Sequence, residues 1–226
     1  MRTLSFLTLL CVLMGGGSAQ ALTYGLAALS NGSTALVAEG RIHRSDATRL
    51  LSLLQQGGAT PSTFVISSPG GELVGALALG ETLRRFGIRT LVGSITADVY
   101  GNASIGPGRC HSACVFVLMG GTARSVVPGS LVGVHSPQPV MVEGGRAYLP
   151  DSSTSRYVVQ RTAPLLRLYA RQMGVSPSVV DLANGVPHST VHNLSSSELT
   201  RYSLVTERRL RNAKAHKTPQ RDRARS

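Results

Sequence analysis

The order of apolar patterns along this chain predicts an α/β fold with a mostly parallel sheet. Short apolar runs at 63–67 and 88–92 indicate buried strands, and residues 72–86 between them repeat apolar side chains at helical spacing. An extended run at 34–39 and a second helical pattern at 45–56 precede them. Strands that alternate with helices in this way are joined by right-handed crossovers, which lay the strands parallel.

Turn residues separate these first elements. Gly57 and Gly58 end the first helix, and Gly87 ends the second. Ser68-Pro-Gly-Gly71 turns the chain between the 63–67 strand and the helix that follows it.

The second half of the chain has weaker patterns. A Gly-rich polar loop is expected at 95–109, a short buried helix at 112–119, and strands at 125–127 and 131–134. Residues 138–150 have no regular pattern. Three further helices are expected: one over 153–173 that is interrupted near Pro164, one that begins at Ser176-Pro177, and one over 195–202 that begins with the capping box Ser195-x-x-Glu198.

Residues 1–21 have the pattern of a secretory signal peptide. Arg2 is its basic start, residues 4–14 are its apolar run, and Ala19-Gln-Ala21 fits a cleavage site. An uncleaved anchor is the alternative, but the apolar run is too short to span a bilayer. Cys11 lacks the small neighbours of a lipoprotein site. We therefore expect a single exported domain over 22–206, in the periplasm or secreted.

The net charge of +12 is concentrated at the C-terminus. Residues 207–226 hold eight Lys and Arg and two acidic residues, a net of +6, and contain no aromatic residue. Such a tail could contact an anionic surface weakly, but without interleaved aromatic residues it more closely fits a disordered, solvated end. We expect no nucleic-acid partner, because an exported protein rarely meets nucleic acid.

Cys110 and Cys114 are the two cysteines that remain after removal of the signal peptide. An even pair in an oxidising compartment can form a disulfide, and a spacing of four allows one if Cys110 lies just outside the helix that contains Cys114. Two buried, unpaired thiols are the alternative. Two thiols without further ligands do not make a metal site, so we expect no metal and no cofactor.

Ser112 and His135 have the character of a nucleophile and its base. Ser112 stands just before the apolar run at 113–119, and His135 just after the strand at 131–134. A serine hydroxyl needs a base to remove its proton during attack, and histidine titrates near neutral pH. The alternatives are an ordinary N-cap serine and a strand-end histidine bonded to the backbone.

Two glycines and one alanine could supply backbone N–H donors to such a site. Gly70 and Gly71 follow a strand and open a helix, where glycine lets another backbone segment approach closely. The N–H group of Ala113 lies in the first turn after Ser112. Donors of this kind stabilise an oxyanion during acyl transfer.

These segments, in this order, resemble the ClpP-type serine peptidases of the ClpP/crotonase superfamily, and most closely the exported, stand-alone ClpP-like proteins. The resemblance spans residues 30–206 and rests on Ser-Pro-Gly-Gly at 68–71, Ser-Ala-Cys at 112–114 and Gly-Val-His-Ser-Pro at 133–137. It implies repeated β-β-α units in a spiral, a handle helix at 153–173 and assembly into a homo-oligomer.

One position departs from that family's pattern. Three residues before Leu194, where the resemblance implies a triad aspartate, the chain has Val191. Asn193 is the first candidate for the third member, and His192 and Asp181 are alternatives. An asparagine would orient the histidine but stabilise its cation less than a carboxylate would. A dyad, a repaired triad and an inactive enzyme all remain open.

The sequence thus predicts an exported serine peptidase that acts on peptides or unfolded protein through an acyl-enzyme. No ATPase partner is expected outside the cytoplasm. The alternative is a weakly active or inactive scaffold that uses the same fold for binding. A crotonase-like acyl-thioester enzyme is disfavoured, because that class relies mainly on oxyanion donors and acidic residues, and not on a serine with a histidine base.

Overall fold

The computed structural model describes residues 21–28, 34–56, 60–97 and 103–206. The expected signal peptide, except for its last residue, and the basic tail at 207–226 lie outside the described residues. Among the helices that are described, none combines the length and the apolar character needed to cross a bilayer.

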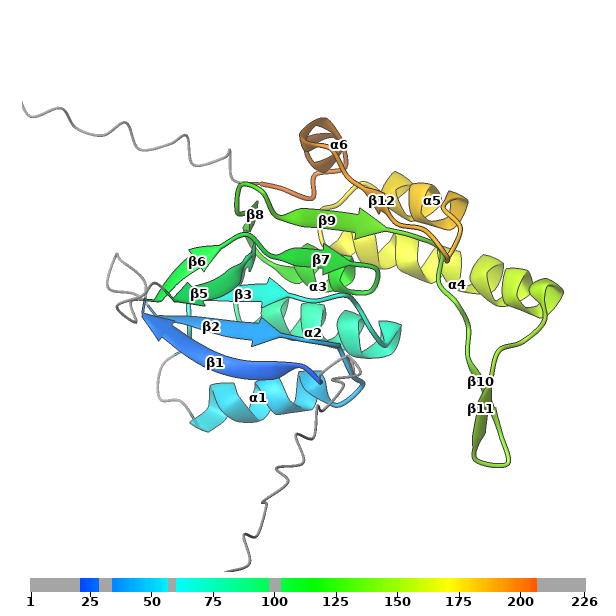
Figure 1. Ribbon diagram of the computed structural model, residues 1–226, viewed down its shortest axis with the longest axis horizontal. Helices are drawn as coiled ribbons and strands as arrows, with labels where there is room; N and C mark the ends of the chain where they lie inside the picture. Colours follow the sequence, from blue (N-terminus) through cyan, green and yellow to red (C-terminus); the bar gives the residue numbers. More distant parts are fainter. Residues whose placement is uncertain (1–20, 29–33, 57–59, 98–102, 207–226) are drawn as a thin grey trace, which may run out of the picture.

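A five-stranded sheet in the order β1-β2-β3-β4-β8 forms the body of the molecule (Figure 1). β1 is antiparallel to β2, and the other neighbours are parallel, which confirms the predicted α/β class. The strands are β1 (Thr23–Ala28), β2 (Thr34–Glu39), β3 (Thr63–Ser67), β4 (Arg89–Val92) and β8 (Arg124–Val126).

Three helices cover one face of this sheet: α1 (Asp46–Gln56), α2 (Leu73–Arg85) and α3 (Cys114–Gly120). Phe64 and Ile66 of β3 are fully buried in the main core with these helices, whereas Val65 between them belongs to a second cluster. Side chains alternate across a strand, so β3 is apolar because both of its faces are covered.

The second cluster explains why the expected loop at 95–109 was wrong. β5 (Ser94–Ala97) and β6 (Ala103–Gly106) form an antiparallel pair in which Ile95 is opposite Ile105. Both isoleucines pack against the cluster that contains Val65. The high content of glycine and polar residues concealed two short strands that are stabilised by this long-range contact.

A smaller sheet lies beside the main one, in the order β12-β9-β7. β7 (Arg109–His111) and β9 (Leu131–Val134) are parallel, and β12 (His192–Asn193) is antiparallel to β9. A bridge between Ser68 and Cys110 joins this sheet to the end of β3. The turn after β3 therefore lies next to the junction of β7 and α3.

The remaining helices are α4 (Ser152–Gln172), α5 (Ser178–Gly185) and α6 (Ser196–Arg201). α6 begins with the predicted capping box of Ser195 and Glu198. α4 continues through Pro164, which is exposed, so the expected interruption is wrong. The Tyr169 hydroxyl donates to the Phe116 carbonyl oxygen at 2.9 Å, which ties the C-terminal half of α4 to α3.

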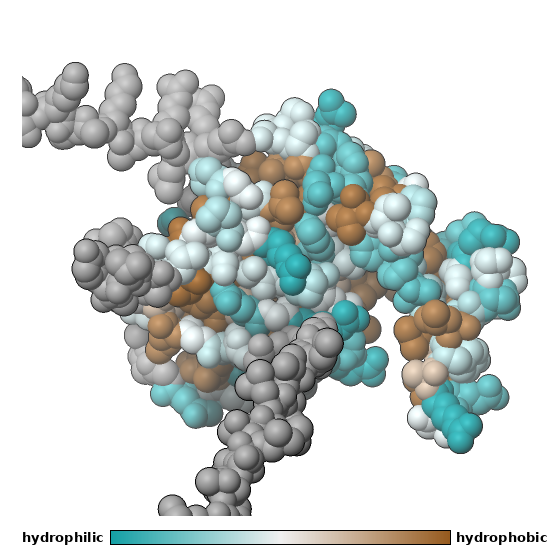
Figure 2. Space-filling view, viewed as in Figure 1, coloured by the Kyte–Doolittle hydropathy of each residue, from teal (hydrophilic) through white to brown (hydrophobic). Residues whose placement is uncertain are grey.

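Residues 138–150 are not irregular as expected. β10 (Met141–Glu143) and β11 (Arg146–Tyr148) form a hairpin that projects from the body (Figure 1). Gly144 and Gly145 both have positive φ, as a two-residue hairpin turn requires. Exposed apolar side chains, among them Val142, gather along this arm (Figure 2).

Candidate active site

Ser112 lies in a sharp turn between β7 and α3. Its φ is 57°, a left-handed conformation that is uncommon outside glycine and that concentrates at functional sites. Its N–H group donates to the Gly133 carbonyl oxygen of β9 at 2.9 Å. The N-cap position of α3 belongs to Ala113, in a helical conformation, so Ser112 is not an ordinary N-cap serine.

The Gly70-Gly71 turn packs directly against Ser112. Gly70 has a φ of 103°, and a Cβ atom there would lie 2.7 Å from the His111 carbonyl oxygen. A Cβ atom on Gly71 would lie 2.1 Å from the Ile42 carbonyl oxygen. Only glycine at both positions allows this approach of the turn to Ser112 on one side and to Ile42 on the other.

Two of the three expected backbone donors are free. The Gly70 N–H group donates to the Ser68 hydroxyl oxygen at 3.0 Å and is not available to a substrate, so its role is steric. The N–H groups of Gly71 and Ala113 have no acceptor among the described residues. Both residues line the same cavity as Ser112. Free donors beside a nucleophile are the elements of an oxyanion hole.

His135 follows β9 and is half-buried. Its Nδ1 atom lies 2.8 Å from the Ser136 carbonyl oxygen, which accepts a hydrogen bond when Nδ1 carries the proton. In that tautomer Nε2 is unprotonated and can act as a base. A backbone carbonyl thus orients the ring as a side-chain acceptor does in a triad.

A cavity of about 720 Å³ contains these groups. Ser112, Ala113, Gly71 and His135 line it, and apolar side chains form much of its wall, among them Phe116, Met119, Leu166, Val179 and Val180. No hydrogen bond joins the Ser112 hydroxyl to His135 within the described residues. Catalytic contacts are often long without substrate and shorten when it binds.

Val191 occupies the position at which the sequence resemblance implies an aspartate. β12 pairs His192 with Val134 and Asn193 with Gly133, and one step further in this register Val191 falls opposite His135. No carboxylate of β12 therefore lies opposite His135.

All three residues considered for the third member have other partners. His192 Nε2 lies 2.8 Å from Glu198 Oε1, and Asp181 forms an ion pair with Arg167. Asn193 hydrogen-bonds His111. We therefore assign the orienting contact to the Ser136 carbonyl oxygen and to none of these side chains.

Sequence reasoning missed two histidines near His135. The His188 ring packs edge to face against that of His135 at 4.8 Å, and its Nδ1 lies 3.3 Å from the same Ser136 carbonyl oxygen. Burial and Arg109 lower the pKa of His111, and a hydrogen bond that its ring donates to the Asn193 side chain opposes them. The described residues contain no group of three His, Cys, Asp or Glu that could hold a metal. His111 directly precedes Ser112 in the sequence, whereas His188 lies in no motif, and only tertiary packing places both rings near His135.

A disulfide joins Cys110 to Cys114. The sequence left open a disulfide and two unpaired thiols, and the structure has the disulfide. Cys110 lies in β7 and Cys114 is the first residue of α3, and both are fully buried. The bond therefore spans the turn that contains Ser112 and limits how far β7 and α3 can separate.

No family model matches this chain, and no curated protein matches it. Solved structures that are similar to it include two mutants of the 1510-N membrane-bound stomatin-specific protease, the second in complex with a substrate peptide. Each gives a TM-score of 0.49 at 14% sequence identity. The match covers 76% of this chain and 75% of the first structure's chain or 71% of the second's. Identity this low carries no information about activity.

Proposed function

We propose that this protein is a serine peptidase with a ClpP-like arrangement of its site, with Ser112 as nucleophile and His135 as base. One observation carries the proposal. Ser112 is held in a left-handed turn, and the free N–H groups of Gly71 and Ala113 line the same cavity. A non-glycine residue in this conformation, next to unpaired donors, fits acyl transfer better than it fits a structural turn.

The reaction would proceed through an acyl-enzyme. Ser112 Oγ attacks the peptide carbonyl carbon while His135 Nε2 takes the hydroxyl proton, and the N–H groups of Gly71 and Ala113 bind the oxyanion. The histidine then gives that proton to the leaving amine, and the peptide C–N bond breaks. Water, deprotonated by the same nitrogen, hydrolyses the serine ester and restores the free enzyme.

The proposed site is a Ser112–His135 dyad in which the backbone carbonyl of Ser136, and not a carboxylate, orients the histidine ring. This carbonyl fixes the tautomer of His135, but an uncharged carbonyl stabilises the imidazolium less than a carboxylate does. We therefore expect slow turnover. The cavity is open and partly apolar, which suits extended peptides or unfolded protein more than folded substrates.

The proposed peptidase would act outside the cytoplasm. The signal-like pattern at 1–21 and the buried disulfide both suit an oxidising compartment, the periplasm or the exterior. No ATP-driven unfolding partner operates there, so the enzyme would act without one.

The second candidate is a catalytically inactive scaffold that binds peptides in the same cavity. Two observations favour it: Val191 replaces the carboxylate, and no hydrogen bond links Ser112 to His135 in the described part of the chain. A scaffold would have no need of a base at His135.

Labelling with a fluorophosphonate separates the two candidates. The peptidase predicts covalent labelling of Ser112 that is lost in Ser112→Ala and reduced by several orders of magnitude in His135→Gln. Ser136→Ala is the matched control, because Ser136 acts through its backbone carbonyl and the variant keeps it. Equal labelling of the wild type and Ser112→Ala would exclude Ser112 as nucleophile, and absent labelling of a folded wild type would favour the scaffold.

A further inference from the structure

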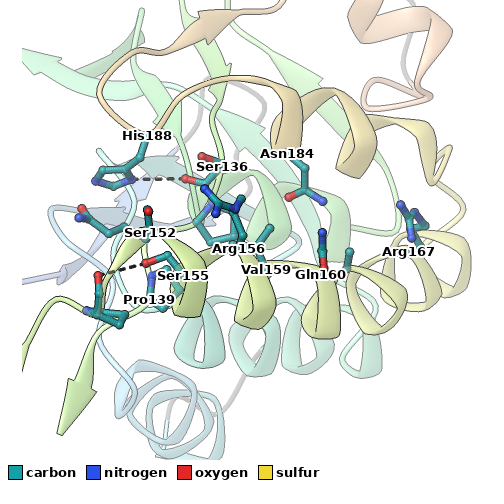
Figure 3. A pocket seen from close by; sticks show the side chains of 14 residues that line it. Ser136, Pro139, Ser152, Ser155, Arg156, Val159, Gln160, Arg167, Asn184 and His188 are labelled. Atoms are coloured by element: carbon teal, nitrogen blue, oxygen red, sulfur yellow. Dashed lines mark hydrogen bonds between the residues drawn. The ribbon is translucent and has the colours of Figure 1, made fainter.

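A second cavity, of about 810 Å³, shares part of its lining with the first. Its lining residues are shown in Figure 3. It is bounded by residues 136–139, by one face of α4 between residues 152 and 167, and by the end of α5, which contributes Asn184. Figure 3 shows Arg156, Val159 and Gln160 along one face of α4, across from Ser136 and Asn184. The mechanism above makes no use of this space.

Arg156 gives this cavity an uncompensated positive charge. The guanidinium is exposed and makes no hydrogen bond or ion pair with any described residue. Arg167, the other cation in the lining, is neutralised by its ion pair with Asp181. No Asp or Glu lines the cavity.

The nearest carboxylate in sequence, Asp151, is already engaged. It caps α4 by accepting hydrogen bonds from the N–H groups of Ser153 and Thr154 and from their hydroxyl groups. These bonds hold the pKa of Asp151 well below its usual range, so it stays a bound anion at the helix end. Arg156 is therefore left to bind an anion from outside.

The other polar groups in the lining are suited to the same ligand. The side chains of Gln160, Asn184 and Ser152 have no hydrogen-bond partner among the described residues. Amide and hydroxyl groups of this kind donate to carboxylate oxygens, and a guanidinium can bind both oxygens at once.

The two cavities are neighbours, because part of their lining is the same. Pro137, Gln138, Asn184 and His188 line both of them. An extended peptide with its reacting carbonyl at Ser112 can therefore continue past His188 towards Arg156. On the basis of the proposed peptidase activity, we propose that the Arg156 cavity is a subsite for a carboxylate of the peptide substrate, either an acidic side chain or the C-terminal carboxylate, a few residues from the cleaved bond.

Peptide binding to the full chain carrying Ser112→Ala tests the subsite without catalysis. The probes are fluorescent, alanine-rich peptides of about nine residues, long enough to span both cavities. In one set, the C-terminus is amidated and each peptide carries a single Asp, Asn or Lys at one position, which differs from peptide to peptide. A second set has a free C-terminus and no Asp. We expect Asp at one or two adjacent positions to bind about fivefold more tightly than Asn. Tighter binding only with the free C-terminus would identify the terminal carboxylate as the ligand.

Variants of Arg156 decide the assignment. Arg156→Gln should remove the preference for a carboxylate, and Arg156→Glu should transfer it to the Lys peptide. Arg161→Gln is the matched control, an exposed arginine of α4 that lines neither cavity, and should leave the preference intact. The preference should also weaken as salt is added.

The outcomes separate this subsite from the peptidase itself. No carboxylate preference at any position, or a preference that survives Arg156→Gln, overturns the subsite even if Ser112 reacts with a fluorophosphonate. A preference that depends on Arg156 supports the subsite even if the wild type does not react, and the protein would then be a peptide-binding scaffold.

Discussion

Gly70 lies so close to Ser112 that a Cβ atom on Gly70 would stand 2.8 Å from the Cβ atom of Ser112. Both residues have positive φ, 103° and 57°, so two left-handed turns from different segments meet at the proposed nucleophile. The position of Ser112 therefore depends on the absence of a side chain at Gly70.

Gly70→Ala should displace Ser112 and remove fluorophosphonate labelling, because the new methyl group would collide with the His111 carbonyl and with Ser112. Gly87→Ala is the control: its φ is 69°, but its Cβ atom would meet nothing within 4 Å. That variant should lose about 1 kcal/mol of stability and keep its labelling rate. Similar labelling of both variants would contradict the steric role of Gly70.

Replacing both Cys110 and Cys114 by serine should affect Ser112 more than the fold. The loop that the disulfide closes is short, so its loss costs only about 2 kcal/mol by chain entropy. We expect a modest fall in Tm and a larger fall in the labelling rate. Mass spectrometry after alkylation of the non-reduced protein checks the bond itself, and two alkylated thiols would show that it is absent.

Arg124→Met should destabilise the protein by about 3 kcal/mol. Arg124 is 3% exposed and donates to the carbonyl oxygens of Gly121, Met173 and Ser203, which join the ends of α3 and α4 to the segment after α6. Burial lowers its pKa to about 10, so it remains charged at neutral pH. Urea unfolding measures the change, with the exposed Arg201→Met as the control. Equal midpoints for the two variants would refute this role.

Stability should decline in mild acid because of His111. Burial and Arg109 lower its pKa in the folded state, so the unfolded chain binds the proton first as the pH falls. The contribution is therefore fully present above about pH 6.5, the ordinary histidine value, and is lost as the pH falls through the folded pKa. Unfolding free energies measured across this window should depend less on pH in His111→Asn. An unchanged slope would show that other groups cause the decline.

Self-association should depend on the exposed face of α4. Leu165 is 65% exposed and Leu168 is 45% exposed, whereas Tyr169 and Met173 of the same segment are buried in the subunit's own core. We expect light scattering to give an oligomeric mass that falls in Leu165→Glu/Leu168→Glu and is unaffected by removal of residues 207–226. A monomeric wild type would refute the oligomer.

Local patterns were sufficient for several features of this protein. The alternation of apolar strands and helices predicts the parallel sheet, and Ser195-x-x-Glu198 predicts the start of α6. The order of the turn at 68–71, Ser112 and His135 along the chain, together with the resemblance that this order carries, predicts them as the candidate site. Each strand, helix start and turn depends on neighbours a few residues away, which the sequence displays directly.

Tertiary contacts decided which groups of the candidate site are free to react. The Gly70 N–H group donates a hydrogen bond to the Ser68 hydroxyl oxygen, so the N–H groups of Gly71 and Ala113 are the ones that remain free to bind an oxyanion. The register of β12 on β9 places Val191 opposite His135, and His192 contacts Glu198 instead, so the acceptor that remains for the His135 ring is the Ser136 carbonyl oxygen. Each outcome depends on strand register or on a hydrogen bond between particular atoms, and a one-residue shift would change it. Residue type and spacing do not encode that register, because it follows from the packing of the whole domain.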